Sequence, residues 1–105
     1  MIRVGCQRGS QGEPLSLSVT GHAGRGAYGE DIVCAAVSAL VETLMLGLAD
    51  VVHEPPGGVV DPGIADIRFA QPMSREARAV VETIIRGLQD LARTEPDAVA
   101  YAERA

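Results

Sequence analysis

Two short runs of alternating apolar and polar residues open the chain. Every second residue in each run is apolar: Ile2, Val4 and Cys6 in the first, and Leu15, Leu17 and Val19 in the second. A period of two is typical of half-buried strands. Residues 9–14 between the runs are rich in glycine and polar residues and include a proline, so we expect a turn that joins the two strands into a hairpin.

The next apolar residues recur at a spacing of three and four, which predicts a helix over residues 32–49. They are Val33, Val37, Leu40, Leu44 and Leu48. Asp31 is expected to cap this helix. Helix positions outside this apolar stripe are also apolar, among them Ile32, Val41 and Met45, which leaves more apolar surface than one small sheet can cover. We therefore expect a homodimer that covers it. A charge at Leu44 or Leu48 should then yield monomers.

The second half of the chain predicts two further strands and a helix. Residues 51–69 should hold the strands, the second over residues 64–69, although prolines and glycines between Pro55 and Gly63 leave little room for regular pairing. Ser74 should cap the last helix, which should end near Thr94. Its apolar stripe is Ala77, Val80, Val81, Ile84, Ile85, Leu88 and Leu91. The tail from Asp97 carries no clear pattern.

This order, ββαββα with short connections, indicates an α/β (α+β) fold in which a mostly antiparallel sheet carries two helices. The 105 residues suit a single domain, and 47% of them are hydrophobic, which is enough for a core. We therefore expect one domain over residues 1–105.

Charge and cysteine content narrow the function and the compartment. A formal net charge of -5 argues against a protein that binds nucleic acid directly. Two cysteines and a strand pattern at the N-terminus predict a reducing cytoplasm and no signal peptide. Residues 32–49 approach the length of a membrane span, but Glu42 interrupts them, so we expect no membrane partner.

Cys34 and His22 are the candidate catalytic residues. Cys34 would lie in the first turn of its helix, where free backbone N–H groups favour a thiolate and can also hold an oxyanion. His22 follows a strand end on the other side of a glycine-rich loop, so it can meet Cys34 as its acid-base partner. Asp31 either orients His22 or only caps the helix, and Ser38 lies one turn after Cys34 on the same face.

Other readings of these residues are weaker. Cys6 alternates with core positions and His53 has no partner at a telling spacing, so both are expected to be structural. A zinc site made of Cys6, His22, Cys34 and His53 lacks the close spacing of metal ligands, and we expect no metal or cofactor. Residues 24–29 read GxGxxG, but a cap at Asp31 would put a carboxylate where a phosphate binds. These glycines are expected to form a mobile flap over substrate.

Two adjacent motifs resemble the signature of the Prp family of ribosomal-processing cysteine proteases. They are Gly21-His22-Ala23-Gly24 and the segment from Gly29 to Ser38, which reads GEDIVCAAVS. The resemblance implies a small homodimeric enzyme that removes an N-terminal extension from a large-subunit ribosomal protein. It also implies catalysis by Cys34 and His22, with support from Asp31 and Ser38.

In that family the glycine loop, with Gly21, Gly24, Gly26 and Gly29, would order around an extended, hydrophobic segment of the substrate. The alternative is a non-enzymatic dimeric module that binds a ribosomal or assembly partner and uses Cys34 only for packing. Thiol reactivity separates the two hypotheses, because only the protease needs an activated Cys34.

Overall fold

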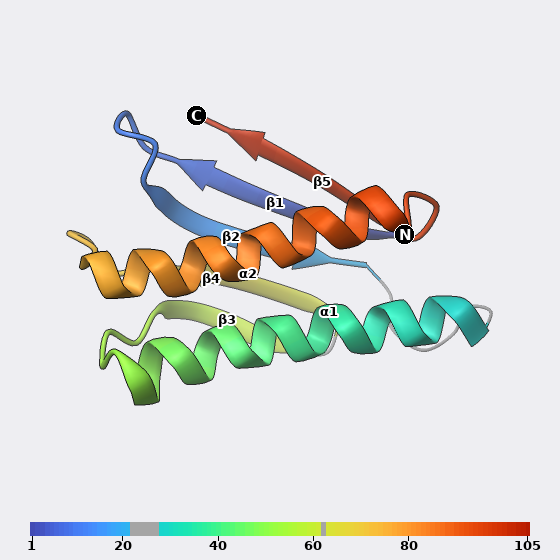
Figure 1. Cartoon of the computed structure of the whole chain (residues 1–105), viewed down its shortest axis with the longest axis horizontal. Helices are drawn as coiled ribbons and strands as arrows, with labels where there is room; N and C mark the ends of the chain where they lie inside the picture. The colour runs from blue at the N-terminus through green and yellow to red at the C-terminus, as the bar shows by residue number, and fades with distance from the viewer. Residues whose placement is uncertain (22–27, 62) are drawn as a thin grey trace.

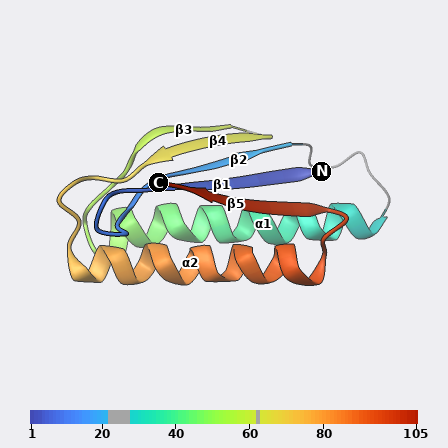
Figure 2. The same ribbon diagram turned by 90° about the horizontal axis from the view of Figure 1, so that it is seen from above.

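The computed structural model contains one sheet of five strands with two helices on a single face (Figures 1 and 2). It describes residues 1–21, 28–61 and 63–105, and it describes the side chains of these residues apart from 28–31. The sheet order is β3-β4-β2-β1-β5. No helix or strand among these described residues covers the opposite face of the sheet (Figure 2).

The predicted N-terminal hairpin is confirmed. Strand β1 (Ile2–Arg8) pairs antiparallel with β2 (Pro14–Thr20), and Val4 lies opposite Val19 while Cys6 lies opposite Leu17. Since partners in an antiparallel pair share a face, this register places the apolar residues of both strands over the helices.

The first helix begins earlier than the sequence predicts. Helix α1 spans Tyr28–Leu46 and continues into a π-helical turn, η1 (Gly47–Val51). Asp31 therefore lies inside the helix, and the predicted cap at Asp31 is wrong. Carboxylates are favourable both at the cap and within the first turn, so the pattern did not distinguish the two positions.

The strands of the second half pair more regularly than expected. Strand β3 (Gly57–Asp61) runs antiparallel to β4 (Ile64–Arg68) in unbroken register, and β4 also pairs with β2. Gly58 makes this possible, because its φ is +102° and a Cβ there would lie 1.8 Å from the carbonyl oxygen of Asp66. The expectation of poor pairing here is wrong.

Helix α2 (Arg75–Thr94) has the predicted limits, and the hydroxyl of Ser74 accepts a hydrogen bond from the backbone N–H of Ala77 at 3.0 Å. The tail then forms a strand that the sequence did not predict, β5 (Val99–Arg104), which runs parallel to β1. The mostly antiparallel sheet with two helices is confirmed, with one parallel edge strand added.

The core lies between the sheet and the two helices. It includes most of the apolar stripe of each helix together with Ile2, Val4, Cys6, Leu17 and Ile67 from the strands. Leu44 and Leu48 are 0% and 2% exposed. A charge at either residue would disrupt this core, so the dimer test that the sequence suggested is wrong.

Residues 32–51 form a segment that is long and apolar enough to cross a membrane, and 33% of its most apolar stretch is buried inside the structure. The buried residues of this segment pack under the sheet. A core helix of a soluble protein meets the same criteria of length and composition, so this feature is weak support for a membrane span.

Candidate active site

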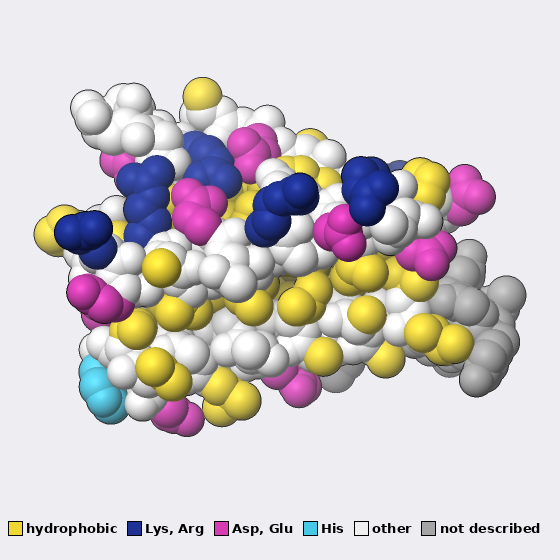
Figure 3. Space-filling model, in the orientation of Figure 1, with side chains coloured by type: hydrophobic (Ala, Val, Ile, Leu, Met, Phe, Trp, Pro, Cys, Tyr) yellow, Lys and Arg dark blue, Asp and Glu magenta, His cyan; other side chains and the backbone are white. Residues whose placement is uncertain are grey.

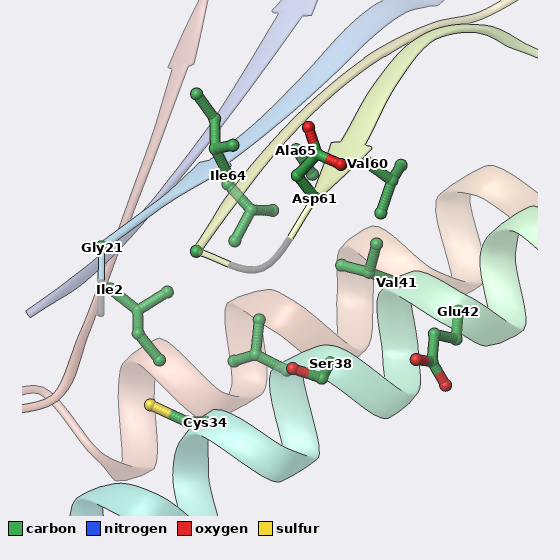
Figure 4. Close-up of a pocket in the computed structure, with 13 residues that line it drawn as sticks. Ile2, Gly21, Cys34, Ser38, Val41, Glu42, Val60, Asp61, Ile64 and Ala65 are labelled. Atoms are coloured by element: carbon green, nitrogen blue, oxygen red, sulfur yellow. The ribbon is translucent and has the colours of Figure 1, made fainter. Parts of the chain in front are cut away.

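A pocket of ≈ 380 Å³ opens between α1 and the strand ends that face it (Figure 4). One wall comes from α1, with Cys34, Val37, Ser38, Val41 and Glu42. The other wall comes from strand residues and the residues next to them: Ile2, Val19, Gly21, Val60, Asp61, Gly63, Ile64 and Ala65. Most of these residues are apolar, so the pocket suits an apolar ligand.

Cys34 lies at one end of the pocket, where its sulfur points toward Ile2 (Figure 4). Its side chain is 6% exposed. Because α1 begins at Tyr28, Cys34 occupies the second helical turn. The predicted position in the first turn is wrong. The N–H groups that lack an intrahelical partner belong to the start of the helix, so they precede Cys34. A helical Cα–Cβ bond tilts toward the N-terminus, which still brings the Cys34 sulfur toward the first turn.

Gly21 faces Cys34 from the end of β2 and is the residue directly before His22. Its φ is +113°, and a Cβ at this position would lie 2.2 Å from the carbonyl oxygen of Met1. Only glycine fits here without a shift of the backbone. The chain therefore leaves β2 at the pocket, although His22, Gly24 and Gly26 lie outside the described residues.

The other predicted site residues lie on α1. Ser38 is exposed and lines the pocket one turn after Cys34. The backbone of Asp31 lies one turn before Cys34, and a spacing of three or four residues puts all three on one face. Gly29 belongs to the first turn of the helix and not to the loop before it. Glycine is a poor helix former, which hid the helix start from the pattern.

The described residues contain no group of three or more metal-ligating side chains. Cys6 and Cys34 are both buried. His53 follows η1, so about 25 Å of helix separates it from Cys34 at 1.5 Å per residue. It therefore cannot share a metal with Cys34, and the zinc alternative fails on geometry.

The alternative of a nucleotide-binding site at residues 24–29 is also excluded, but not by the argument that the sequence analysis used. Helix α1 does begin within the GxGxxG string, as a dinucleotide site requires, so the argument from a later cap is wrong. However, β4 separates β2 from β3, and the helix connects strands that are not neighbours. The pocket is also lined by apolar and acidic side chains, which do not suit phosphate.

The sequence matches the family described as Cysteine protease Prp over residues 1–100. The chain belongs to this family. The ribosomal processing cysteine protease Prp of Staphylococcus aureus is 30% identical to it over 93 residues, which cover 87% of this chain and 88% of that protein. Membership of the Prp family makes the chain a cysteine protease.

Solved structures of the Staphylococcus aureus protease agree with the fold of this Prp-family chain. A structure with a covalently linked product peptide has a TM-score of 0.89 at 26% identity and covers 99% of this chain and 100% of its own. A structure with a substrate peptide has a TM-score of 0.91 at 25% identity, with the same coverage. Peptide binding is thus recorded for proteins of this family and fold.

The sequence did not predict the apolar walls of the pocket. Ile2 of β1 joins Val60 and Ile64 of the β3–β4 hairpin only through the order of strands in the sheet, and residues 55–63 were expected to pair poorly. One local signal was present. Asp61, Pro62 and Gly63 read as a tight turn, and Gly63 has the positive φ of +80° that such a turn requires.

Proposed function

We propose that this protease removes the N-terminal extension of a large-subunit ribosomal protein during ribosome assembly, with Cys34 as nucleophile and His22 as its acid-base partner. The position of Cys34 carries the proposal, since it lies at the end of an apolar pocket that β-strand residues close from the other side. The name and the peptide complexes of the Staphylococcus aureus relatives support the substrate class.

The assignment of His22 follows from elimination and from Gly21. The chain has two histidines, and His53 lies too far from Cys34 to exchange a proton with it. Gly21 lines the pocket and is directly bonded to His22. These two observations support His22 as the imidazole that assists Cys34 in this proposal.

The proposed reaction has two halves. The Cys34 thiolate attacks the scissile carbonyl carbon, and the carbonyl oxygen becomes an oxyanion that backbone N–H groups near the start of α1 stabilise. His22 then gives a proton to the departing amine, which leaves a thioester on Cys34. Water, deprotonated by His22, attacks the thioester and releases the new carboxylate together with the Cys34 thiol.

Asp31 and Ser38 have supporting roles in this proposal. Both lie one helical turn from Cys34 on the same face of α1. In the proposal, as the family resemblance implies, Asp31 supports the catalytic pair and the Ser38 hydroxyl donates or accepts hydrogen bonds within the pocket. Gly24 and Gly26, which lie outside the described residues, contribute to substrate binding in this proposal. No metal or cofactor takes part.

The test uses a peptide that spans the N-terminal extension of the ribosomal protein from the same organism. We expect wild-type protein to make a single cut, detected by mass spectrometry, and Cys34→Ala and His22→Ala to abolish it. Cys6→Ala and His53→Ala are matched controls, because they remove the same groups away from the pocket and should keep activity. An intact peptide with folded wild-type protein would contradict the proposal and favour a binding module.

We also propose that the protein forms a homodimer through the outer face of α1. Ile32 and Leu46 on α1 are 54% and 60% exposed, and Val51 of η1 is 72% exposed, so an apolar strip follows the solvent side of the helix. Figure 3 shows apolar side chains along the helices on this face of the molecule. A second copy would remove this surface from water.

Leu46→Glu should convert the dimer to monomers in sedimentation without unfolding the chain, because Leu46 lies outside the core. Val59→Glu is the control, since Val59 is similarly exposed, at 55%, but lies on β3. A monomeric Val59→Glu beside a dimeric Leu46→Glu would move the interface to the sheet edge. The low cysteine content, two in 105 residues, supports the cytoplasm as the site of action.

A further inference from the structure

Strand β3 ends the sheet with a free edge. It is the outermost strand in the order β3-β4-β2-β1-β5, and all five of its residues are exposed. Among the described residues, β4 is the strand that pairs with it. Figure 1 shows this edge on the side of the sheet nearest α1. A free strand edge presents unpaired backbone N–H and C=O groups, to which an extended chain can pair.

The geometry of Gly58 shows which backbone groups of β3 face this edge. A Cβ at Gly58 would point into β4, where it would collide with the carbonyl of Asp66 and lie 3.3 Å from the Cα of Ile67. The Cα of Gly58 therefore faces β4, as at a non-hydrogen-bonded pair, and its N–H and C=O groups face outward. Such pairs alternate with hydrogen-bonded pairs, and the register is unbroken. Val60 thus also turns its backbone groups outward, whereas Val59 between them bonds to β4.

Prolines limit this free edge to two donors. Pro56 precedes Gly58 by two residues, and Pro62 follows Val60 by two residues. Since proline has no N–H group, the outward donors of Gly58 and Val60 have no continuation on either side. Proteins use prolines in this way to keep edge strands from pairing with further copies of the chain. The edge therefore suits one short extended segment.

Val60 connects the free edge to the Cys34 pocket. While its backbone groups face outward, its side chain lines the pocket and points toward Val41 of α1 (Figure 4). Cys34 lines the same pocket. A chain that pairs with β3 at Val60 therefore lies beside the pocket and can continue along it toward Cys34.

We propose that the substrate peptide binds as an added strand at the edge of β3, held by backbone hydrogen bonds to Gly58 and Val60. This inference rests on the proposed peptidase function and describes how the enzyme holds its substrate. The main-chain bonds fix the peptide in extended form, and every second side chain of the peptide then faces the apolar pocket. A second copy of the chain is the weaker occupant, because two donors between prolines make a short contact.

Amide hydrogen exchange tests this pairing directly. The Cys34→Ala protein is mixed with the peptide that spans the N-terminal extension, and exchange of the β3 amides is followed by NMR. Without peptide, the amide of Val59 should exchange slowly and the amides of Gly58 and Val60 should exchange fast. Saturating peptide should slow exchange at Gly58 and Val60 by about 10-fold or more and leave Val59 unchanged.

N-methylated peptides give a second test on the same protein. Each peptide carries one N-methyl group, which removes one backbone donor, and its affinity is measured by fluorescence anisotropy. We expect a loss of about 10-fold at two positions that are two residues apart, and none at the position between them.

Two substitutions at Val60 separate its backbone from its side chain. Val60→Pro removes an N–H group that β4 does not use, so the variant should fold and bind the peptide about 10-fold more weakly than Val60→Ala, which keeps the N–H group. Val59→Pro is the control for the ladder, because it removes an N–H group that pairs with β4 and should lower the urea midpoint of unfolding.

The outcomes distinguish this inference from the proposed function. Peptide binding without slower exchange at Gly58 and Val60 would overturn the added strand, and cleavage by wild-type protein would leave the peptidase standing. Slow exchange at both amides before peptide is added would assign the edge to a second copy, which also overturns the inference, as would absence of peptide binding. Protection of both amides by a peptide that wild-type protein does not cut would support the added strand and contradict the peptidase.

Discussion

The two ends of β1 differ in how their charges are satisfied. At the end of the strand, the Arg8 guanidinium donates to both carboxylate oxygens of Glu82 at 2.9 and 3.0 Å and to Glu103 at 3.1 and 3.2 Å. Tyr101 donates to the same Glu103 at 2.6 Å. At the start of the strand, Ile2 faces a pocket whose carboxylates have no cationic partner among the described residues.

The two cysteines lie at different ends of the molecule, one near the Arg8 network and one at the pocket. Cys6 lies near the Arg8 network, is 2% exposed, and has its pKa raised by burial. Cys34 lines the open pocket at the other end. One end of the molecule thus uses its polar groups to fix the strands and α2, while the other opens a pocket that Cys34, Glu42 and Asp61 line.

Alkylation rates should separate the two cysteines by the largest margin. If Cys34 is the nucleophile, iodoacetamide should label it on the order of 10³-fold faster than Cys6, because reagent can enter the pocket that Cys34 lines, whereas Cys6 is 2% exposed in the core. Mass spectrometry of the labelled protein gives both rates. Equal and slow labelling of both residues would remove the functional difference between the two ends.

Two neighbouring glycines of β3 test how the pocket wall is built. Gly58→Ala should lower the free energy of unfolding by about 3 kcal/mol, because alanine is strained at φ +102° and its Cβ would collide with the Asp66 carbonyl. It should also raise KM, since β3 carries Val60 and Asp61.

Gly57→Ala is the matched control for this substitution. A Cβ at Gly57 would meet nothing within 4 Å, so its effect on urea unfolding should be within ~0.5 kcal/mol. If both variants unfolded alike, the close approach of Gly58 to β4 would not be what holds the wall in place.

Removal of Arg8 should destabilise the end of β1 where Arg8 pairs with Glu82 and Glu103, and it should leave the pocket unchanged. Arg8→Ala should lower the free energy of unfolding by about 2 kcal/mol, because Glu82 and Glu103 lose their shared cation and then repel each other. Peptide cleavage by the folded variant should stay within about 2-fold of wild type, since Arg8 lies at the far end of β1.

Arg93→Ala serves as the control for Arg8, because Arg93 pairs with Asp90 in an exposed setting where both side chains are more than half exposed. Its cost in urea unfolding should be below about 0.5 kcal/mol. A large loss of activity in Arg8→Ala would show that the two ends of β1 are coupled.

Local patterns predicted most of the fold because each element carries its own periodicity. The hairpin, both helices and β4 follow from alternation, helical spacing and a Ser74 cap that lie within a few residues of one another. Strand β5 was missed because residues 99–104 do not alternate cleanly. Their extended form depends on parallel pairing with β1, almost the whole chain away.

The sequence predicted the polar residues of the site better than it predicted the apolar residues that form the pocket walls. Cys34 and Ser38 were singled out from their helical spacing, and both line the pocket. The pocket walls at Ile2, Val60 and Ile64 depend on sheet order, which a sequence pattern does not contain. Glycine at position 29 and a carboxylate at Asp31 concealed the helix start, so Cys34 was placed one turn too early.

The smallest expected effect is the dependence of the Arg8 network on pH. Hydrogen bonds from Arg8 lower the pKa of Glu82 and of Glu103 below the ordinary value of 4.5. A lowered folded-state pKa contributes stability that is fully present above 4.5 and is lost as pH falls through the folded value. Urea unfolding should therefore show a flat contribution from this source between about pH 5.5 and 7, and a loss below pH 4.5.

For Glu82 that loss should be about 1 kcal/mol at most, because its side chain is 35% exposed and solvent screens the pair. Glu82→Gln should be less stable than wild type at pH 7 and should lose less of its free energy of unfolding on acidification. Glu76→Gln is the control, because Glu76 is an exposed residue of α2 outside the Arg8 network. Its loss of stability on acidification should equal that of wild type. If Glu82→Gln and wild type lost the same free energy of unfolding on acidification, the end of β1 at Arg8 would be held by packing alone. The contrast between the two ends of β1 would then rest on the pocket.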